Sequence, residues 1–276
     1  MVLLDKSDYG KALHALKKVT INNLFARAVI EQSVTGKVYV DDPINSATFY
    51  VVHPYGMTLL FGESNNKKFN EAFRTYALNK DKLRDKFEWM QTFPSNWDEV
   101  LLSLFKDSLV NSFDNTEKSE KGVIELNTRV NFKFNITKYQ SLSTYIIDKN
   151  ISIVRANGQM FRDMQGGVVP SYFWDSEEDF LKNGVAFALF YKGELASMSF
   201  SSYWFDNDFE MGIETKEKFR GKGFAELVCR AIIDYCVENN YKPIWSCRLE
   251  NIGSYKLAQK LGFEPTLYSP YYRLSK

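Results

Sequence analysis

The sequence predicts a mixed α/β (α+β) protein made of two domains. Short β-rich runs alternate with helical segments along most of the chain, and a polar stretch near the middle separates one such series from another. The length of 276 residues suits either one large domain or two of ordinary size. We place the boundary after Gly122, which gives an N-terminal domain of residues 1–122 and a C-terminal domain of residues 123–276.

The N-terminal half has the pattern of a small α/β unit. Apolar residues recur at helical spacing from Asp8 to Ser33. The polar stretch from Asn111 to Gly122 ends this half, as expected of a connection at the surface. The other elements that we expect are β-strands at 38–40, 47–52 and 57–61, separated by turn residues, and helices at 67–78, 80–90 and 97–105.

The C-terminal half shows a clearer order of elements. Residues 123–134 alternate apolar and polar side chains, which indicates an exposed strand or hairpin. The apolar positions of residues 225–239 follow the stripe of a helix that packs on a sheet. The other expected elements are helices at 175–183 and 254–261 and strands at 185–191, 194–204, 209–215, 243–247 and 268–274.

Composition narrows the classes of function. Hydrophobic residues make up 45% of the chain, charged residues 25%, and the formal net charge is +1. This balance is typical of a globular protein and argues against nucleic-acid binding that depends on phosphate neutralisation. No apolar run is long enough to span a bilayer, and the start of the chain lacks the apolar core of a secretory signal. We therefore expect a cytoplasmic protein with no membrane partner.

The cysteine and histidine content argues against a metal site. The three cysteines, Cys229, Cys236 and Cys247, form no CxxC pair, and His14 and His53 are the only histidines. Neither a disulfide framework nor a zinc site is indicated. We expect buried, reduced thiols and no bound metal.

A glycine-containing basic loop, Arg220-Gly221-Lys222-Gly223-Phe224-Ala225, lies between an expected strand and an expected helix. Backbone N–H groups and the helix dipole converge on a phosphate at such a place, and glycine lets the backbone approach closely. A basic glycine turn is more often only a solvated loop, so its setting decides. The loop lacks the GxxxxGK[ST] pattern of a P-loop, and no acidic residue of the Rossmann type follows.

The loop resembles the R/Q-x-x-G-x-G/A signature of the GNAT N-acetyltransferase superfamily, with Arg220, Gly223 and Ala225 in the defining positions. A strand that ends at Cys247, followed by Asn251 and a helix that runs into Leu261-Gly262-Phe263, matches in the expected order. The resemblance covers residues 185–263, and several of its segments are similar to the subgroup related to zwittermicin A resistance acetyltransferases.

This resemblance implies a C-terminal GNAT fold, with a central, mostly antiparallel, splayed sheet and flanking helices, preceded by the smaller N-terminal domain. It also implies acetyl-coenzyme A as the cofactor. The pyrophosphate would lie on the amides of the glycine loop, the pantetheine arm along the preceding strand, and the helix after Asn251 would form a second wall. The cofactor-binding residues that it implies are Ile213, Thr215, Arg220, Gly221, Lys222, Gly223, Phe224, Ala225, Asn251 and Ser254.

Acetyl transfer to an amine needs a group that removes a proton, because a protonated alkyl amine has a pKa of roughly 10. Glu210 and Glu214 lie on one face of the expected strand 209–215, and we favour Glu210, with Glu214 or water as alternatives. A surface carboxylate in an ion pair is the commoner role of a strand glutamate. Many family members protonate the thiolate with a tyrosine, but Ala258 stands at that position here. Tyr255, one helical turn earlier, or water would replace it.

The acceptor and the role of the N-terminal half stay open at this point. The subgroup resemblance favours a small-molecule amine over a protein amine, and the absence of the family tyrosine leaves a catalytically inactive acyl-CoA sensor as an alternative. The N-terminal half would either shape the acceptor side or form a homodimer. Aromatic residues cluster before the glycine loop, where they would line a pocket or simply pack in the core: Tyr172, Phe173, Trp174, Tyr203 and Trp204.

Overall fold

The computed structural model describes residues 1–112, 122–142 and 148–276, and within them the chain divides into two compact units. Unit 1 consists of Met1–Asn131, Arg248–Glu250 and Leu267–Lys276, and unit 2 of Phe132–Cys247 and Asn251–Thr266. Most of the polar connection expected between 111 and 122 lies outside the described residues. The boundary after Gly122 therefore stays a prediction.

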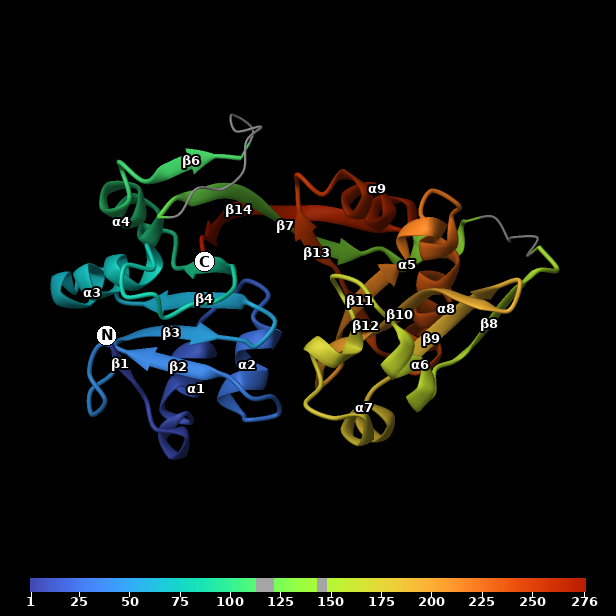
Figure 1. Ribbon diagram of the computed structural model, residues 1–276, viewed down its shortest axis with the longest axis horizontal. Coiled ribbons are helices and arrows are strands. Elements are labelled where there is room, and N and C mark those ends of the chain that lie inside the picture. The colour runs from blue at the N-terminus through green and yellow to red at the C-terminus, as the bar shows by residue number, and fades with distance from the viewer. Residues whose placement is uncertain (113–121, 143–147) are drawn as a thin grey trace. The chain divides into compact units, whose positions relative to one another are not determined.

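Unit 2 contains a five-stranded sheet in the order β12-β11-β10-β9-β8. All neighbours are antiparallel except β11 and β12, which are parallel and are joined by α8, as a parallel pair requires a long crossover. Figure 1 shows α8 lying across β9 and β10. The elements are α5 (Ile136–Gln140), β8 (Ile151–Arg155), α6 (Gly158–Asp163), α7 (Glu177–Asn183), β9 (Ala186–Tyr191), β10 (Glu194–Phe205), β11 (Asp208–Thr215), α8 (Phe224–Glu238), β12 (Lys242–Ile244) and α9 (Ile252–Lys260).

Unit 1 contains a sheet in which β1-β2-β3-β4-β5 are neighbours, and Tyr272–Leu274 of β14 pair with β5. Again all pairs of β1 to β5 are antiparallel except the last, β4 with β5, which α3 connects. The elements are β1 (Val2–Leu3), α1 (Lys11–Leu16), α2 (Leu24–Ile30), β2 (Lys37–Val40), β3 (Thr48–Val52), β4 (Met57–Gly62), α3 (Lys67–Ala77), β5 (Glu88–Phe93), α4 (Asn96–Leu104) and β6 (Leu109–Asn111).

Three further strands have residues assigned to both units: β7 (Ile124–Phe134), β13 (Ser246–Arg248) and β14 (Phe263–Leu274). The strand expected at 243–247 is thus two short strands, separated at Trp245. The segment expected as an exposed strand at 123–134 is β7, a single strand in which Ile124 and Val130 are fully buried.

The two units repeat one order of elements. Each begins with a strand, continues with two helices and three antiparallel strands, and then has a helix, a strand parallel to the last one and a final helix. The series β1, α1, α2, β2, β3, β4, α3, β5, α4 in unit 1 corresponds to β8, α6, α7, β9, β10, β11, α8, β12, α9 in unit 2 (Figure 1). Unit 1 is therefore built on the same plan as unit 2.

One expected helix, at 80–90, is wrong. The helix α3 ends at Ala77, and the chain reaches β5 at Glu88 through a turn. Asn79 and Lys82 take positive φ angles of 51° and 52°, which a helix does not allow. Arg84 is buried in this turn and donates to the carbonyl oxygen of Ala77 at 2.8 Å, so tertiary hydrogen bonds hold the irregular segment.

Candidate functional site

The glycine loop leads from β11 into the N-terminus of α8. Gly221 and Gly223 have φ angles of +76° and +80°, and a side chain added at either would meet no atom within 4 Å. Glycine is needed there for the backbone conformation and leaves the space above the loop open. Gly223 precedes the first residue of α8, and no side chain of the described residues caps that end of the helix. The amides of the first turn therefore stay available to an anion.

Aromatic side chains fix the loop on both flanks. Phe219 and Phe224 are buried in the core beneath α8, with ring centroids 6.1 Å apart. The ammonium of Lys222 lies 5.6 Å from the ring centroid of Tyr191 and 5.3 Å from that of Phe219, within the range of a cation–π contact. The side chain of this loop lysine is thus held against the two aromatic rings.

Arg220 is joined to the end of β11. Its Nε donates to the carbonyl oxygen of Thr215 at 3.1 Å, and its Nη2 donates to Oε1 of Glu214 at 3.2 Å. Its side chain is 60% exposed. A cation with a fixed base and an exposed guanidinium suits the binding of a phosphate beside the loop.

The strands β11 and β12 separate beside this loop. Their pairing covers Asp208–Glu210 opposite Lys242–Ile244, and Lys242 N donates to the carbonyl oxygen of Asn207 at 2.7 Å. The remaining residues of β11, Met211–Thr215, continue beyond the end of β12. The sheet is therefore splayed at this point, as the sequence resemblance implied.

Backbone hydrogen bonds show which groups of β11 face the splayed side. Lys216 N donates to the carbonyl oxygen of Ala196 in β10 at 2.9 Å, so the backbone of Lys216 faces β10. Alternate residues of a strand direct their N–H and C=O groups to opposite edges. Met211 and Ile213 therefore direct theirs toward the edge that β12 leaves, where an extended ligand can pair with them.

Glu210 lies where the two strands separate. It is 6% exposed and accepts a hydrogen bond from Ser246 Oγ at 3.3 Å. The residue of β10 that pairs with Glu210 is Tyr203, which lies at a bulge between Ser201 and Tyr203. A bulge re-aims side chains locally, and this one sits beside the carboxylate that we expected to act as the base.

Glu214, the alternative base, has its carboxylate surrounded by N–H groups. Oε2 accepts from Gly167 N at 2.7 Å and Val168 N at 3.0 Å, and Oε1 accepts from Thr215 N at 3.1 Å in addition to Arg220. These four N–H donors occupy both oxygens and hold the carboxylate between Arg220 and the backbone of residues 167–168. This arrangement gives Glu214 a structural role in unit 2.

The helix α9 carries the other candidate residues. Asn251 caps it, with Oδ1 accepting from Ser254 N at 3.2 Å, and Ser254 Oγ accepts from Trp245 Nε1 at 3.2 Å. Tyr255 is partly buried, and its ring centroid lies 5.6 Å from that of Phe132. Ala258, at the position of the family tyrosine, is fully buried. Asn251 and Ser254 therefore also have structural roles at the start of α9.

Two of the other cofactor candidates direct their side chains into the sheet structure. Ile213 packs in the core cluster beneath α8, and Thr215 Oγ1 lies 2.7 Å from Ser197 Oγ. The backbone of Ile213 lies along the edge of β11 that β12 leaves, which is consistent with the pantetheine role that the resemblance implied. The backbone N–H and C=O of Thr215 are instead hydrogen-bonded to Glu214 Oε1 and Arg220 Nε.

Sequence reasoning missed two parts of the site. One is Ser246, which contacts Glu210 and carries no motif. The other is the first part of the segment of residues 164–174, in which Gly167 and Val168 donate to Glu214. The adjacent pair Gly166-Gly167 was the local signal for this part. The last part of the segment belongs to the aromatic cluster that the sequence indicated, and Trp174 Nε1 donates to the carbonyl oxygen of Ser201 at 2.8 Å.

The aromatic cluster before the glycine loop is mostly packed. Phe173 is buried, and its ring centroid lies 5.5 Å from that of Phe200 and 5.6 Å from that of Tyr203. Trp204 packs on Phe209. The cluster thus fixes the segment 164–174 on the face of β10.

A glycine loop at a helix start, beside a parallel strand pair that splays, is the arrangement that the resemblance implied for an N-acetyltransferase of the GNAT type. The GNAT acetyltransferase family matches residues 14–271, so the chain belongs to the GNAT acetyltransferase family and is an acyltransferase.

The chain is similar in sequence to one protein and in fold to two solved structures. The chain is 27% identical over 253 residues to the uncharacterized N-acetyltransferase YdfB of Bacillus subtilis (strain 168), covering 90% of this chain and 89% of that protein. A crystal structure of a GCN5-related N-acetyltransferase-like protein from Streptococcus suis 89/1591 is similar, with a TM-score of 0.69, 16% identity and coverage of 97% and 99% of the two chains. A tandem GNAT protein from the clavulanic acid biosynthesis pathway has a TM-score of 0.62 at 11% identity, covering 99% of this chain and 97% of that one.

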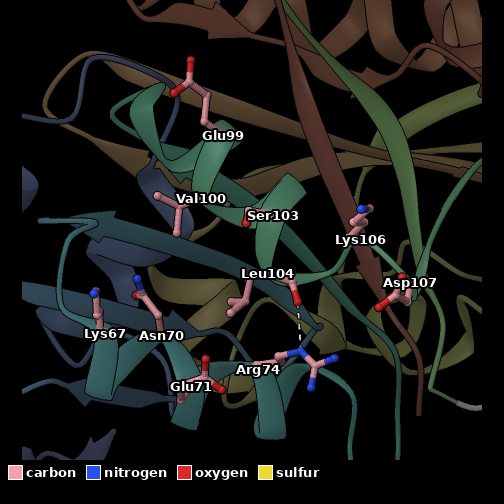
Figure 2. A pocket seen from close by; sticks show the side chains of 10 residues that line it. All are labelled: Lys67, Asn70, Glu71, Arg74, Glu99, Val100, Ser103, Leu104, Lys106 and Asp107. Carbon is pink, nitrogen blue, oxygen red and sulfur yellow. Dashed lines mark hydrogen bonds between the residues drawn. The ribbon is translucent and has the colours of Figure 1, made fainter.

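Unit 1 has a groove lined by residues of α3, of α4 and of the chain just after α4, with a volume of about 760 Å³ (Figure 2). Arg74 Nε donates to the carbonyl oxygen of Leu104 across it at 2.9 Å and so joins the two helices. Both cationic and carboxylate side chains line the groove. Its lining is Lys67, Asn70, Glu71, Arg74, Glu99, Val100, Ser103, Leu104, Lys106 and Asp107.

The three cysteines are buried, as expected, and none of them is in a disulfide within the part of the chain that the structure describes. Burial raises the pKa of the Cys229 and Cys236 thiols to about 12. In the described part of the chain, no group of three or more histidine, cysteine, aspartate or glutamate side chains is placed to hold a metal ion. None of the helices described combines the length and the hydropathy needed to cross a membrane.

Proposed function

We propose that the enzyme transfers the acetyl group of acetyl-coenzyme A to the primary amine of a small molecule, and that the reaction takes place in unit 2. The observation that carries the proposal is the coincidence of two features of β11. Its last residues run along the splayed edge of the sheet, and its end leads into the open glycine loop at the N-terminus of α8.

The residues present fit this cofactor. The amides from Gly221 to Ala225, with the Arg220 guanidinium and the Lys222 ammonium, would hold the pyrophosphate. The backbone of Met211 and Ile213 would pair with the amides of the pantetheine arm. When bound, acetyl-coenzyme A supplies an acetyl group activated as a thioester.

Proton transfer falls to side chains next to the splayed edge. Glu210 would take a proton from the acceptor amine, directly or through one water, while Ser246 holds its carboxylate. A backbone N–H at the splayed edge of β11 would donate to the acetyl carbonyl oxygen as negative charge develops there. Tyr255 would give a proton to the departing thiolate, because the alanine at position 258 has no proton to give.

The small-molecule acceptor is supported by the similarity of several segments to zwittermicin A resistance acetyltransferases. The similar segments are Glu210–Thr215, the loop Arg220–Ala225, Pro243–Cys247 and Ser254–Phe263. A test would measure the melting temperature with acetyl-coenzyme A and then thiol release with a panel of small amines and a lysine peptide. Turnover of small amines above the peptide supports the proposal, and preference for the peptide contradicts it.

We also propose that one acetyl-coenzyme A binds per chain, because unit 1 repeats the fold without the splayed edge. β4 pairs with β5 over Met57–Phe61, five of its six residues. Trp97 Nε1 donates to the carbonyl oxygen of Gly62, the last residue of β4, at 3.1 Å. The N-terminus of α3 is capped by Asn66, whose Oδ1 accepts from Phe69 N at 3.1 Å. The features that correspond to the cofactor site of unit 2 are thus closed by protein groups.

A further inference from the structure

We infer that Glu214 links the cofactor loop to the segment 164–174, so that binding of acetyl-coenzyme A at Arg220–Ala225 orders the backbone beside the acceptor. Glu214 is then a positioning residue. The inference rests on the proposed function, since it needs the cofactor phosphates to lie at Arg220.

The carboxylate of Glu214 joins two separate parts of unit 2. Oε2 holds the backbone of the segment, through Gly167 N at 2.7 Å and Val168 N at 3.0 Å. Oε1 holds the cofactor side, through Thr215 N at 3.1 Å and Arg220 Nη2 at 3.2 Å. One oxygen binds the segment 164–174 and the other binds Thr215 and Arg220. Because the carboxylate is planar and rigid, a shift on one side moves the groups bound on the other side.

The backbone of the segment is built to reach this carboxylate. Gly166 has a φ angle of +152°, and a Cβ atom added there would lie 2.4 Å from Cδ of Glu214. Any larger residue would push the segment off the carboxylate. The close approach of the backbone to Glu214 therefore requires glycine at this position.

The same segment lies on the face of the sheet that carries Glu210. Glu210 and Glu214 share a face of β11, because they are four residues apart in a strand. At the other end of the segment, Phe173 packs edge-on against Tyr203, the residue opposite Glu210 in β10. One end of the segment is therefore held at Glu214, and the other end lies next to Glu210, the proposed base.

The exposed side of this linkage is Arg220. Its side chain is 60% exposed, while that of Glu214 is 9% exposed. A phosphate that pairs with the guanidinium of Arg220 restricts the motion of that side chain. The motion of Glu214, and of the amides of Gly167 and Val168 that it holds, is then restricted as well. Because linkage is reciprocal, a ligand that orders the segment also strengthens cofactor binding. Cofactor binding would therefore prepare the acceptor side.

The test is amide hydrogen exchange of the full-length protein, with and without acetyl-coenzyme A. In the wild-type protein we expect bound cofactor to slow exchange in residues 166–168 by about fivefold or more. In Glu214→Gln the side chain has one acceptor oxygen instead of two, so it can serve the segment or Arg220 but not both. We expect this variant to bind the cofactor and to lose the slowing.

Two further variants isolate the linkage. Glu217→Gln removes the same charge from an exposed side chain in the short 3-10 helix before the glycine loop, and it should keep the slowing. Gly166→Ala breaks the contact between the segment and Glu214 from the segment's side and should also lose the slowing of exchange. This variant tests the inference if Glu214→Gln does not fold. Slowing that persists in Glu214→Gln, or cofactor binding without slowing in the wild-type protein, overturns the inference. Absence of any acetyl-coenzyme A binding overturns the cofactor assignment together with it.

Discussion

Ser246 Oγ donates a hydrogen bond of 3.3 Å to Oε1 of Glu210, and so joins the start of β13 to the last residue of β11 that pairs with β12. A buried carboxylate at the point where a sheet splays is held in place by this hydroxyl and lies next to the edge where the acetyl group would be presented. Its position, more than its residue type, distinguishes it from the other glutamates of unit 2.

Replacing Glu210 by glutamine should lower turnover roughly a hundredfold and leave the affinity for acetyl-coenzyme A unchanged, because the general base is lost while the loop is intact. Steady-state kinetics and calorimetry measure the two effects. Glu238→Gln, at an exposed position at the end of α8, is the matched control and should have wild-type turnover. If Glu214→Gln shows the loss of turnover and Glu210→Gln does not, Glu210 is not the base.

Replacing Gly223 by valine should raise the dissociation constant of acetyl-coenzyme A by about tenfold or more, roughly 1.4 kcal/mol. A β-branched side chain strongly disfavours a φ of +80° and distorts the amides that face the phosphates. Gly193→Val is the matched control, since Gly193 also has a φ of +80° with open space around it but lies in the β9–β10 turn. Equal affinity in the folded Gly223 variant would contradict the placement of the cofactor.

Replacing Tyr255 by phenylalanine should lower kcat by roughly tenfold to a hundredfold, with the ring still packed on Phe132. The loss should shrink for acyl donors with a more acidic thiol, which need no proton on departure. Tyr268→Phe, at an exposed tyrosine of β14, controls for the loss of a phenol. Unchanged kcat in Tyr255→Phe would assign the proton to water.

Calorimetric titration of the full chain with acetyl-coenzyme A should give one binding site. The reason is the contrast between β11, which runs on beyond β12, and β4, which stays paired with β5 up to Phe61. Gly223→Val should weaken all of the binding that is observed. Two sites per chain, or a site that this variant leaves unaffected, would contradict the assignment of the cofactor to unit 2 alone.

The parts of the site that the sequence predicts are those encoded by neighbouring residues. Two glycines with positive φ and the helix after them form a local pattern, and they are readable without a structure. The link from Glu214 to Gly167 is not, because 47 residues separate the two and a backbone N–H has no sequence signature.

The fold, too, is predicted only where neighbouring residues encode it. Helices and strands with a clear apolar period, such as α8 and β3, agree with their expected ranges. The segment 80–90 contains charged and apolar residues at helical spacing, but Arg84 is held by the backbone carbonyl oxygen of Ala77 at the end of α3 and by that of Ser275, 191 positions away. The repeat of one fold plan in the two units is also missed, since pairing order, rather than residue identity, carries it.

His53 should make unit 1 sensitive to acid. It is fully buried, and its Nδ1 accepts a hydrogen bond from Tyr55 N at 3.1 Å, which requires the neutral ring. Burial, and secondarily the charge of Lys86, lowers the pKa of His53 from its ordinary value of 6.5 to about 3.

Because the folded state binds the proton less readily than the unfolded state, the contribution of His53 to stability is complete above pH 6.5 and falls as the pH drops toward 3. Between pH 7 and pH 5 the free energy of unfolding should fall by about 2 kcal/mol through this residue. Urea unfolding at both values measures it. His53→Gln should be less stable at pH 7 and should lose this part of the pH dependence, whereas His14→Gln, at an exposed position, should retain it. An equal pH dependence in His53→Gln and the wild-type protein would show that His53 is not the group responsible.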